Sequence, residues 1–131
     1  MSTPPTKPES PPSPLGSYSP VRLVPMGPAT LAFVSGLTAG GQAPDDAAAQ
    51  ARLIFARMGE LLAEVGGSLA QVVKITTFLT DMADYEAYNA VRNQVFAAVS
   101  PPPASSTVGT SALPRPGCRV EIEAVAVILA R

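Results

Sequence analysis

The sequence predicts an α+β domain in which two helices cover one face of a mixed sheet, in the chain order ββαβαββ. Segments 71–80 and 119–129 are rich in β-branched and apolar residues and are the strongest strand signals. An apolar stripe at helical spacing lies on each side of the first of these strands. Because each helix joins strands that can share one sheet, both helices are expected on the same face. The other face is then expected to meet solvent or another subunit.

The first half of the domain is expected to contain a hairpin and a helix. Residues 31–35 (LAFVS) form an apolar run, and residues 22–24 can pair with it through a proline-containing turn. Asp45 or Asp46 can cap an alanine-rich helix that stops at the glycine pair 66–67. The apolar residues of this helix fall at helical spacing: Ile54, Met58, Leu61, Leu62 and Val65.

The second half is expected to repeat the strand and helix pattern. Strand 71–80 is followed by a turn that can cap a helix over 85–99, and three prolines end that helix. Segment 104–111 is a polar, β-branched candidate strand. After a turn with two prolines, residues 119–129 form the final strand.

Composition limits what the chain can do. Residues 1–14 hold six of the fifteen prolines and are expected to be a disordered tail, leaving one domain over 15–131. The chain is 47% hydrophobic and only 15% charged, so self-association is the simplest way to cover its apolar surface. The net charge is −1 with no basic stripe, which argues against a nucleic-acid groove, and no segment is apolar for long enough to cross a membrane.

The chain contains no histidine and a single cysteine, Cys118. This composition excludes a Ser-His-Asp triad and any histidine-ligated metal site made by this chain alone. A free thiol without a signal peptide fits a reducing cytoplasm. Chemistry must therefore come from carboxylates, hydroxyls, backbone groups or an arginine.

Glu121 in the final strand is the best candidate for chemistry. Alternation places Arg119, Glu121 and Glu123 on one face of the strand. A carboxylate desolvated on an otherwise apolar strand has a raised pKa and can act as a base near neutral pH. The structural alternative is that Glu121 pairs with Lys74, Arg119 or a backbone donor and only supports the fold.

Three segments resemble the RidA/YjgF family of reactive-intermediate deaminases. They read LAFVSG, SLAQVVKITTFLTDMADYEAYNAV and LPRPGCRVEIEAVAV, in this order and spacing, and the similarity runs from about residue 15 to residue 129. The resemblance implies a chorismate-mutase-like fold and a homotrimer with a barrel-like core and clefts between subunits. It also implies hydrolysis of small-molecule enamines and imines to ammonia and a keto acid, without a metal or organic cofactor.

The resemblance also implies roles for individual residues. Glu121 matches the glutamate that activates the attacking water. The residues that match the substrate-binding positions are Tyr18, Ser35, Gly36, Asn89, Ser105, Ser106 and Thr107, and Arg119 is added as a candidate cation. On their own residue types, these hydroxyls and amides are more often caps or surface groups than ligands.

One position departs from the family pattern. Ser105 stands where the deaminases carry an arginine that grips the substrate carboxylate. A hydroxyl cannot replace a guanidinium in that role, because charge-assisted bonds are roughly twice as strong as neutral ones. We therefore expect poor turnover of standard 2-imino acids, unless Arg22, Arg115 or Arg119 supplies the cation.

The departure leaves three hypotheses open. The chain is an imine hydrolase with an altered substrate, a trimer that binds a ligand without turnover, or a specialised step in a biosynthetic pathway. A ribonuclease fits badly with the net charge of −1 and the absence of histidine.

Overall fold

The computed structural model describes residues 16–129, which form five strands and two helices in the predicted order ββαβαββ. The elements are β1 (Val21–Met26), β2 (Ala29–Leu37), α1 (Ala47–Glu64), β3 (Val72–Leu79), α2 (Tyr85–Val95), β4 (Ala104–Gly109) and β5 (Val120–Leu129). The predicted disordered tail, residues 1–14, lies outside the described residues.

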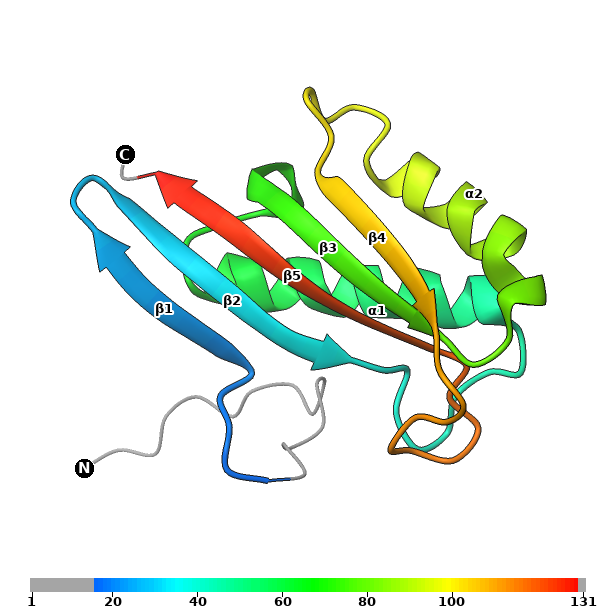
Figure 1. Ribbon diagram of the computed structural model, residues 1–131. Helices are drawn as coiled ribbons and strands as arrows, with labels where there is room; N and C mark the ends of the chain where they lie inside the picture. The colour runs from blue at the N-terminus through cyan, green and yellow to red at the C-terminus, as the bar shows by residue number, and fades with distance from the viewer. Residues whose placement is uncertain (1–15, 130–131) are drawn as a thin grey trace.

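The strands form one sheet in the order β1-β2-β5-β3-β4. Neighbouring strands are antiparallel, except that β3 and β4 run parallel because α2 crosses over between them. The last strand of the chain, β5, therefore lies in the centre of the sheet between β2 and β3 (Figure 1). A residue on β5 has a neighbouring strand on each side.

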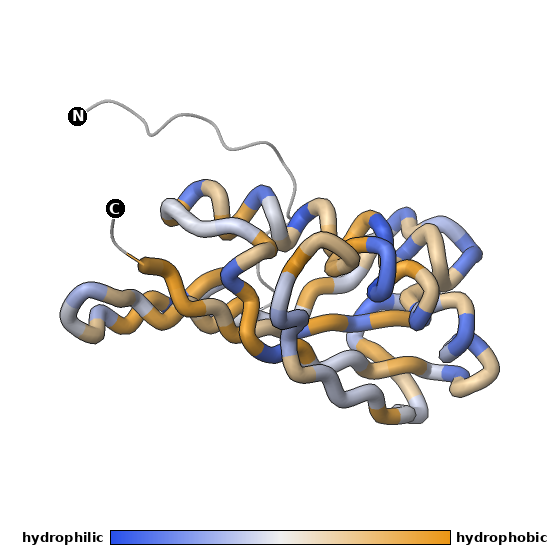
Figure 2. The backbone as a smooth tube through the Cα atoms, turned by 90° about the horizontal axis from the view of Figure 1, so that it is seen from above, coloured by the Kyte–Doolittle hydropathy of each residue, from blue (hydrophilic) through white to orange (hydrophobic). Residues whose placement is uncertain are grey.

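Both helices lie on the same side of the sheet, as predicted. α1 packs against β2 and β5, and α2 packs against α1. Figure 2 shows the helical layer and the sheet from the edge. The opposite side of the sheet, which we call the open face, is left without a covering element among residues 16–129.

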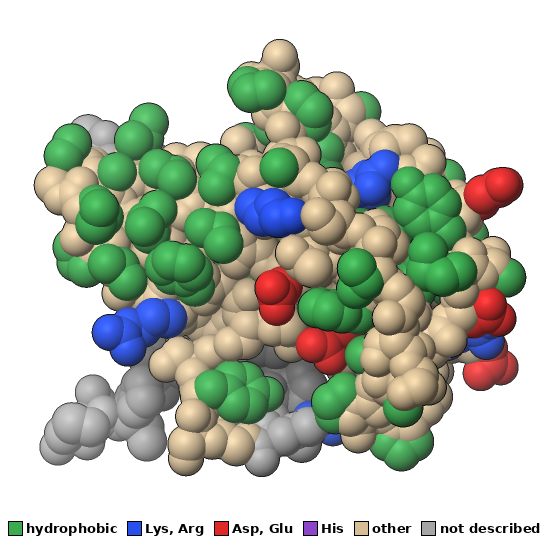
Figure 3. All heavy atoms as spheres, in the orientation of Figure 1, with side chains coloured by type: hydrophobic (Ala, Val, Ile, Leu, Met, Phe, Trp, Pro, Cys, Tyr) green, Lys and Arg blue, Asp and Glu red, His purple; other side chains and the backbone are tan. Residues whose placement is uncertain are grey.

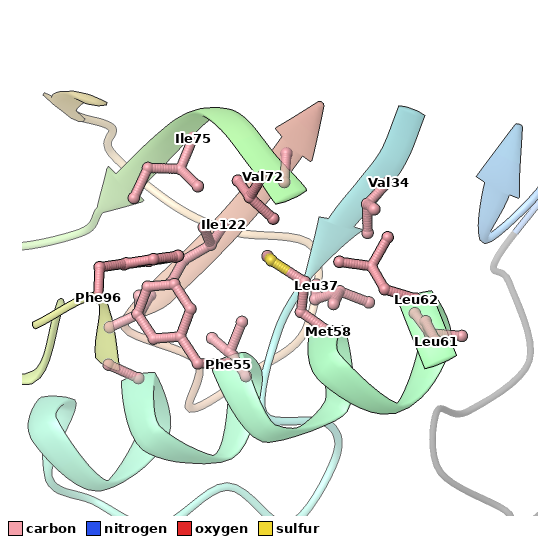
Figure 4. Packing of buried hydrophobic residues seen from close by; sticks show 14 of the residues in the cluster. Val34, Leu37, Phe55, Met58, Leu61, Leu62, Val72, Ile75, Phe96 and Ile122 are labelled. Atoms are coloured by element: carbon pink, nitrogen blue, oxygen red, sulfur yellow. The ribbon is translucent and has the colours of Figure 1, made fainter. Parts of the chain in front are cut away.

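The core lies between α1 and the sheet. Phe55 and Met58 point from α1 toward Ile75 and Ile122 of the sheet, and all four side chains are buried (Figure 4). Phe96 closes the end of this core with its ring edge-on to Phe55, at 5.5 Å between ring centroids. Burial of each such side chain contributes about 1.5–3 kcal/mol to folding.

The ends of α1 follow from its sequence. The side chain of Asp46 accepts a hydrogen bond from the Ala48 N–H at 3.1 Å, which satisfies one of the unpaired donors of the first turn. After the helix, Gly66 adopts φ +86°, a left-handed conformation that favours glycine. The glycine pair therefore ends α1 as predicted.

α2 is shorter than predicted. It ends at Val95, and residues 96–98 form turns rather than a further helical turn. The N–H groups of Ala97 and Val99 bond three residues back, to Gln94 and Phe96. Proline disfavours helical backbone in the preceding residue, so the run beginning at Pro101 prevents the helix from continuing. Phe96, the first residue after α2, packs into the core.

The open face is apolar over much of its area. Phe33 is 42% exposed, Met26 57% and Leu129 63%, although all three are large hydrophobic residues. Figure 3 shows hydrophobic side chains gathered over β1, β2 and the adjoining part of β5, with acidic side chains near the middle of the face. A patch of this kind is typical of an interaction surface.

Candidate functional site

Glu121 lies on the open face of the central strand. Along β5 the even-numbered residues from Val120 to Ile128 are buried against the helices, so Glu121 and the other odd-numbered residues point the other way. Glu121 stands directly opposite Phe78 of β3 in the strand register. The predicted alternation is confirmed from Val120 to Leu129.

A bulge in β2 places Gly36 against the Glu121 side chain. Between the pairs Val34–Ala124 and Leu37–Ile122, β2 has two residues, Ser35 and Gly36, where β5 has only Glu123. A Cβ atom added to Gly36 would lie 2.2 Å from Oε2 of Glu121 and 2.8 Å from its Cδ. The carboxylate therefore rests on the bare backbone of Gly36, and a side chain at that position would displace it.

The electrostatic surroundings of Glu121 favour a base. Desolvation by burial raises the pKa of Glu121, and the neighbouring charge of Glu123 raises the same pKa further. Within residues 16–129, no side chain or backbone group hydrogen-bonds or forms an ion pair with the Glu121 carboxylate. A carboxylate without a partner, at the surface of an open sheet, is free to accept a proton from a bound water.

The structural partners considered for Glu121 are engaged elsewhere. Lys74 donates to the Ser106 hydroxyl at 2.9 Å. Arg119 donates to both carboxylate oxygens of Asp84, at 2.9 and 3.2 Å, and this hydrogen bond and charge raise the pKa of Arg119. β5 begins only at Val120, so the strand alternation that placed Arg119 beside Glu121 does not extend to it.

Ser35 connects this site to the segment that carries Tyr18. The Ser35 hydroxyl donates to the carbonyl of Ser19 at 2.6 Å, and its N–H donates to the carbonyl of Pro20 at 2.9 Å. Tyr18 itself is half exposed. The structure thus brings Ser35, Gly36 and Glu121 together. The two hydrogen bonds of Ser35 also fix the segment that directly follows Tyr18 at the same end of β2.

The predicted residues of β4 are divided between the two sides of the sheet. Ser105 and Thr107 of β4 stand opposite Ile75 and Thr77 of β3, whose side chains are buried on the helical side. Ser106 between them points to the open face, where it accepts the bond from Lys74. The predicted site residues are therefore divided between the two faces of one subunit.

Asn89 and Ser105 are joined by an arginine that the sequence analysis did not single out. Arg92 of α2 donates to the Ser105 hydroxyl at 3.1 Å and also to the side-chain oxygen of Asn89. Its guanidinium lies 5.6 Å from the centroid of the Tyr88 ring. We call Tyr88, Asn89, Arg92 and Ser105 the α2–β4 cluster. Tyr88 and Asn89 lie four and three residues before Arg92, so helical spacing alone predicts that these three side chains are neighbours.

The described part of the chain has no metal-binding cluster and no membrane-spanning helix. Residues 16–129 contain no group of three His, Cys, Asp or Glu side chains that could hold a metal ion. No helix within this range is long and apolar enough to cross a bilayer. Cys118 is buried, and its thiol donates to the carbonyl of Gly40 at 3.4 Å.

Comparison with known proteins agrees with the fold and the motifs. The model of the family described as Endoribonuclease L-PSP matches residues 8–128. Protein DfrA of Myxococcus xanthus is 39% identical over 104 residues, which cover 79% of this chain and 70% of the relative. A Bos taurus protein named 2-iminobutanoate/2-iminopropanoate deaminase is 40% identical over 90 residues, which cover 68% of this chain and 64% of the relative.

A solved structure gives the same result. The crystal structure of a YjgF/YER057c/UK114 family member from Mycobacterium tuberculosis superposes with a TM-score of 0.70 at 36% identity, covering 82% of this chain and 85% of that one. Structures of this family have the chorismate-mutase-like fold, which confirms the predicted fold class. The chain therefore belongs to the Endoribonuclease L-PSP family, the RidA/YjgF family that the sequence motifs predicted.

Proposed function

We propose that the protein is an enamine/imine deaminase-like hydrolase in which Glu121 activates water. The observation that carries the proposal is the carboxylate of Glu121, which is desolvated, lies against the backbone of Gly36 and has no partner among residues 16–129. The relative from Bos taurus named as a 2-iminobutanoate/2-iminopropanoate deaminase supports the same reaction class. Because position 105 is a serine, the substrate is expected to differ from the standard 2-imino acids.

The reaction needs one base that can return its proton. Water attacks the carbon of the protonated imine, C=NH2+, while Glu121 removes a proton from the water, and a neutral tetrahedral carbinolamine forms. Glu121, now protonated, returns this proton to the amino nitrogen, and the C–N bond breaks as the carbinolamine hydroxyl becomes a carbonyl. Glu121 passes the hydroxyl proton to the departing ammonia, so the products are a carbonyl compound and an ammonium ion. A carboxylate with a raised pKa suits both steps, because it holds the proton long enough to deliver it to the leaving amine.

The complete site is proposed to lie between the subunits of a homotrimer. Glu121, Gly36 and Ser35 lie toward the open face, whereas Asn89 and Ser105 belong to the α2–β4 cluster on the helical side. One subunit cannot present both groups to a single small molecule. The apolar open face gives a second copy a surface on which to pack. A small molecule in the cleft is the expected partner, in a cytoplasmic protein that binds neither nucleic acid nor membrane.

Ammonia release from imines tests the catalytic proposal. Imines formed in place by an amino-acid oxidase are offered to the wild type and to Glu121→Gln, which keeps the shape of the side chain. We expect a loss of roughly 10²–10⁴-fold in kcat for the variant. Glu123→Gln is the matched control, since Glu123 is exposed on the same strand and should keep most of the activity. Equal rates in wild type and Glu121→Gln refute the assigned role.

The serine at position 105 favours a second candidate, a trimer that binds its ligand without turnover. This candidate predicts thermal stabilisation of the wild type by small metabolites with no ammonia release from any imine. Turnover that depends on Glu121 excludes it.

The oligomeric state tests the assembly. Phe33→Glu places a charge in the apolar part of the open face and is expected to convert the trimer to monomers in light scattering. Ala56→Glu places the same charge on the exposed side of α1 and should leave the assembly unchanged. A Phe33→Glu protein that stays trimeric contradicts the assigned interface.

A further inference from the structure

Among residues 16–129, only neutral groups hold Arg92. Its guanidinium donates to the hydroxyl of Ser105 at 3.1 Å, to the amide oxygen of Asn89, and to that of Asn93 at 3.3 Å. The guanidinium carbon also lies 5.6 Å from the centroid of the Tyr88 ring. These contacts fix the direction of the guanidinium but leave its charge uncompensated.

No carboxylate neutralises Arg92 within residues 16–129. Arg119, by contrast, binds Asp84 through two of its nitrogens. A guanidinium has five N–H donors, and the bonds from Arg92 to Ser105, Asn89 and Asn93 use three of them. A partly buried guanidinium that is oriented in advance and lacks a counter-charge is suited to an external anion.

The space beside Arg92 indicates the kind of anion. A pocket of about 220 Å³ is lined by Arg92, Asn93, Phe96, Pro102 and Pro103. One cation and one amide lie among apolar walls, so the pocket fits a molecule with a small anionic group and an apolar or aromatic side group. The pocket lies beside the α2–β4 cluster, whose Asn89 and Ser105 are the predicted substrate-binding residues.

We infer that Arg92 is the specificity-determining residue of the proposed site, binding the carboxylate of an imino acid with a bulky apolar side group. The guanidinium reaches position 105 from α2 instead of from β4. This inference rests on the proposed function and adds its substrate class. It also revises the reason for expecting poor turnover of standard 2-imino acids. The cation is present, but it comes from α2 and lies beside a pocket with apolar walls.

A pair of substrates that differ only in the carboxylate tests the inference. The first is the imine that an L-amino-acid oxidase forms from phenylalanine, and the second is the imine that a flavin amine oxidase forms from 2-phenylethylamine. Arg92→Gln is expected to lower kcat/KM for the first by roughly 10–100-fold, mainly through KM, and to leave the second unchanged. Arg92→Lys should recover part of the loss. Arg52→Gln, at an exposed position on α1, should change neither substrate.

Two results separate failure of the inference from failure of the proposed function. If the wild type hydrolyses imines and Glu121→Gln abolishes this, an Arg92→Gln protein that keeps its preference for the carboxylate-bearing imine overturns the inference alone. If no imine is hydrolysed, binding of phenylpyruvate decides by calorimetry. Tight binding that Arg92→Gln weakens and Glu121→Gln preserves supports the inference, whereas no binding by the wild type, or equal binding by Arg92→Gln, overturns it.

Discussion

Substitution of Gly36 by alanine tests how the site positions its carboxylate. The added Cβ would lie 2.2 Å from Oε2 of Glu121, and side-chain carbons essentially never approach another atom within 3.0 Å. The oxygen must therefore move by at least 0.8 Å. Because Oε2 is the free end of a flexible side chain, rotation of Glu121 can relieve the clash while the backbone keeps its place.

This geometry predicts a large effect on activity and a small effect on stability. A displacement of about 1 Å at a catalytic group can reduce the rate by roughly 10²-fold. The rotation of one partly exposed side chain costs about 1 kcal/mol or less in unfolding free energy. We expect Gly36→Ala to lose most imine-hydrolysing activity and to unfold within a few degrees of the wild type.

Ammonia release and thermal unfolding, measured on the same preparations, check this prediction. Gly41→Ala is the matched control, since an added Cβ there meets no atom within 4 Å and the backbone has no positive φ. Wild-type activity in Gly36→Ala would refute the contact between Gly36 and the working position of Glu121. A loss of activity that merely follows unfolding of the protein would refute it equally.

The remaining predictions concern charge and buried polar groups. Because the charge of Glu123 raises the pKa of Glu121, Glu123→Gln should shift the rising limb of the pH–rate profile to lower pH, and an unchanged limb contradicts this coupling. Burial raises the pKa of Glu121 in the folded state above its value in the unfolded chain. The folded protein therefore gains stability from protonation of Glu121. This gain is fully present below the unfolded-state pKa and is lost as the pH rises through the folded-state pKa. Glu121→Gln should therefore raise the melting temperature at pH 7 but not below about pH 4. The hydroxyls of Thr77 and Tyr88 share a buried hydrogen bond of 2.5 Å, so Tyr88→Phe should cost about 1–3 kcal/mol in urea unfolding, and adding Thr77→Val should recover part of it. The buried side chain of Gln50 donates to the carbonyls of Pro44 and Gly117 and accepts from the N–H of Arg119. Gln50→Leu should therefore cost about 2 kcal/mol or more in urea unfolding. Wild-type stability of this variant would show that these backbone groups find other partners.

The sequence alone determined the fold class, the order of the elements and the face on which Glu121 lies. These follow from local periodicity, because side chains alternate along a strand and repeat every 3.6 residues along a helix. The strongly patterned strand β5 is therefore confirmed, including the buried set from Val120 to Ile128. The family motifs added the candidate residues, but not how these residues are distributed between the two faces of the sheet.

Only the tertiary structure decided which residues meet. The bulge that seats Glu121 on Gly36 depends on the register between β2 and β5, which are more than 80 residues apart in the chain. Arg119 binds Asp84 and does not continue the alternation of β5, because the strand begins only at Val120. Arg92 meets Ser105 because the parallel pairing of β3 and β4 brings the end of α2 beside β4. Each of these contacts joins separate segments of the chain. The periodicity of residues within one segment does not determine how that segment is aligned with another, so the sequence pattern could not predict them.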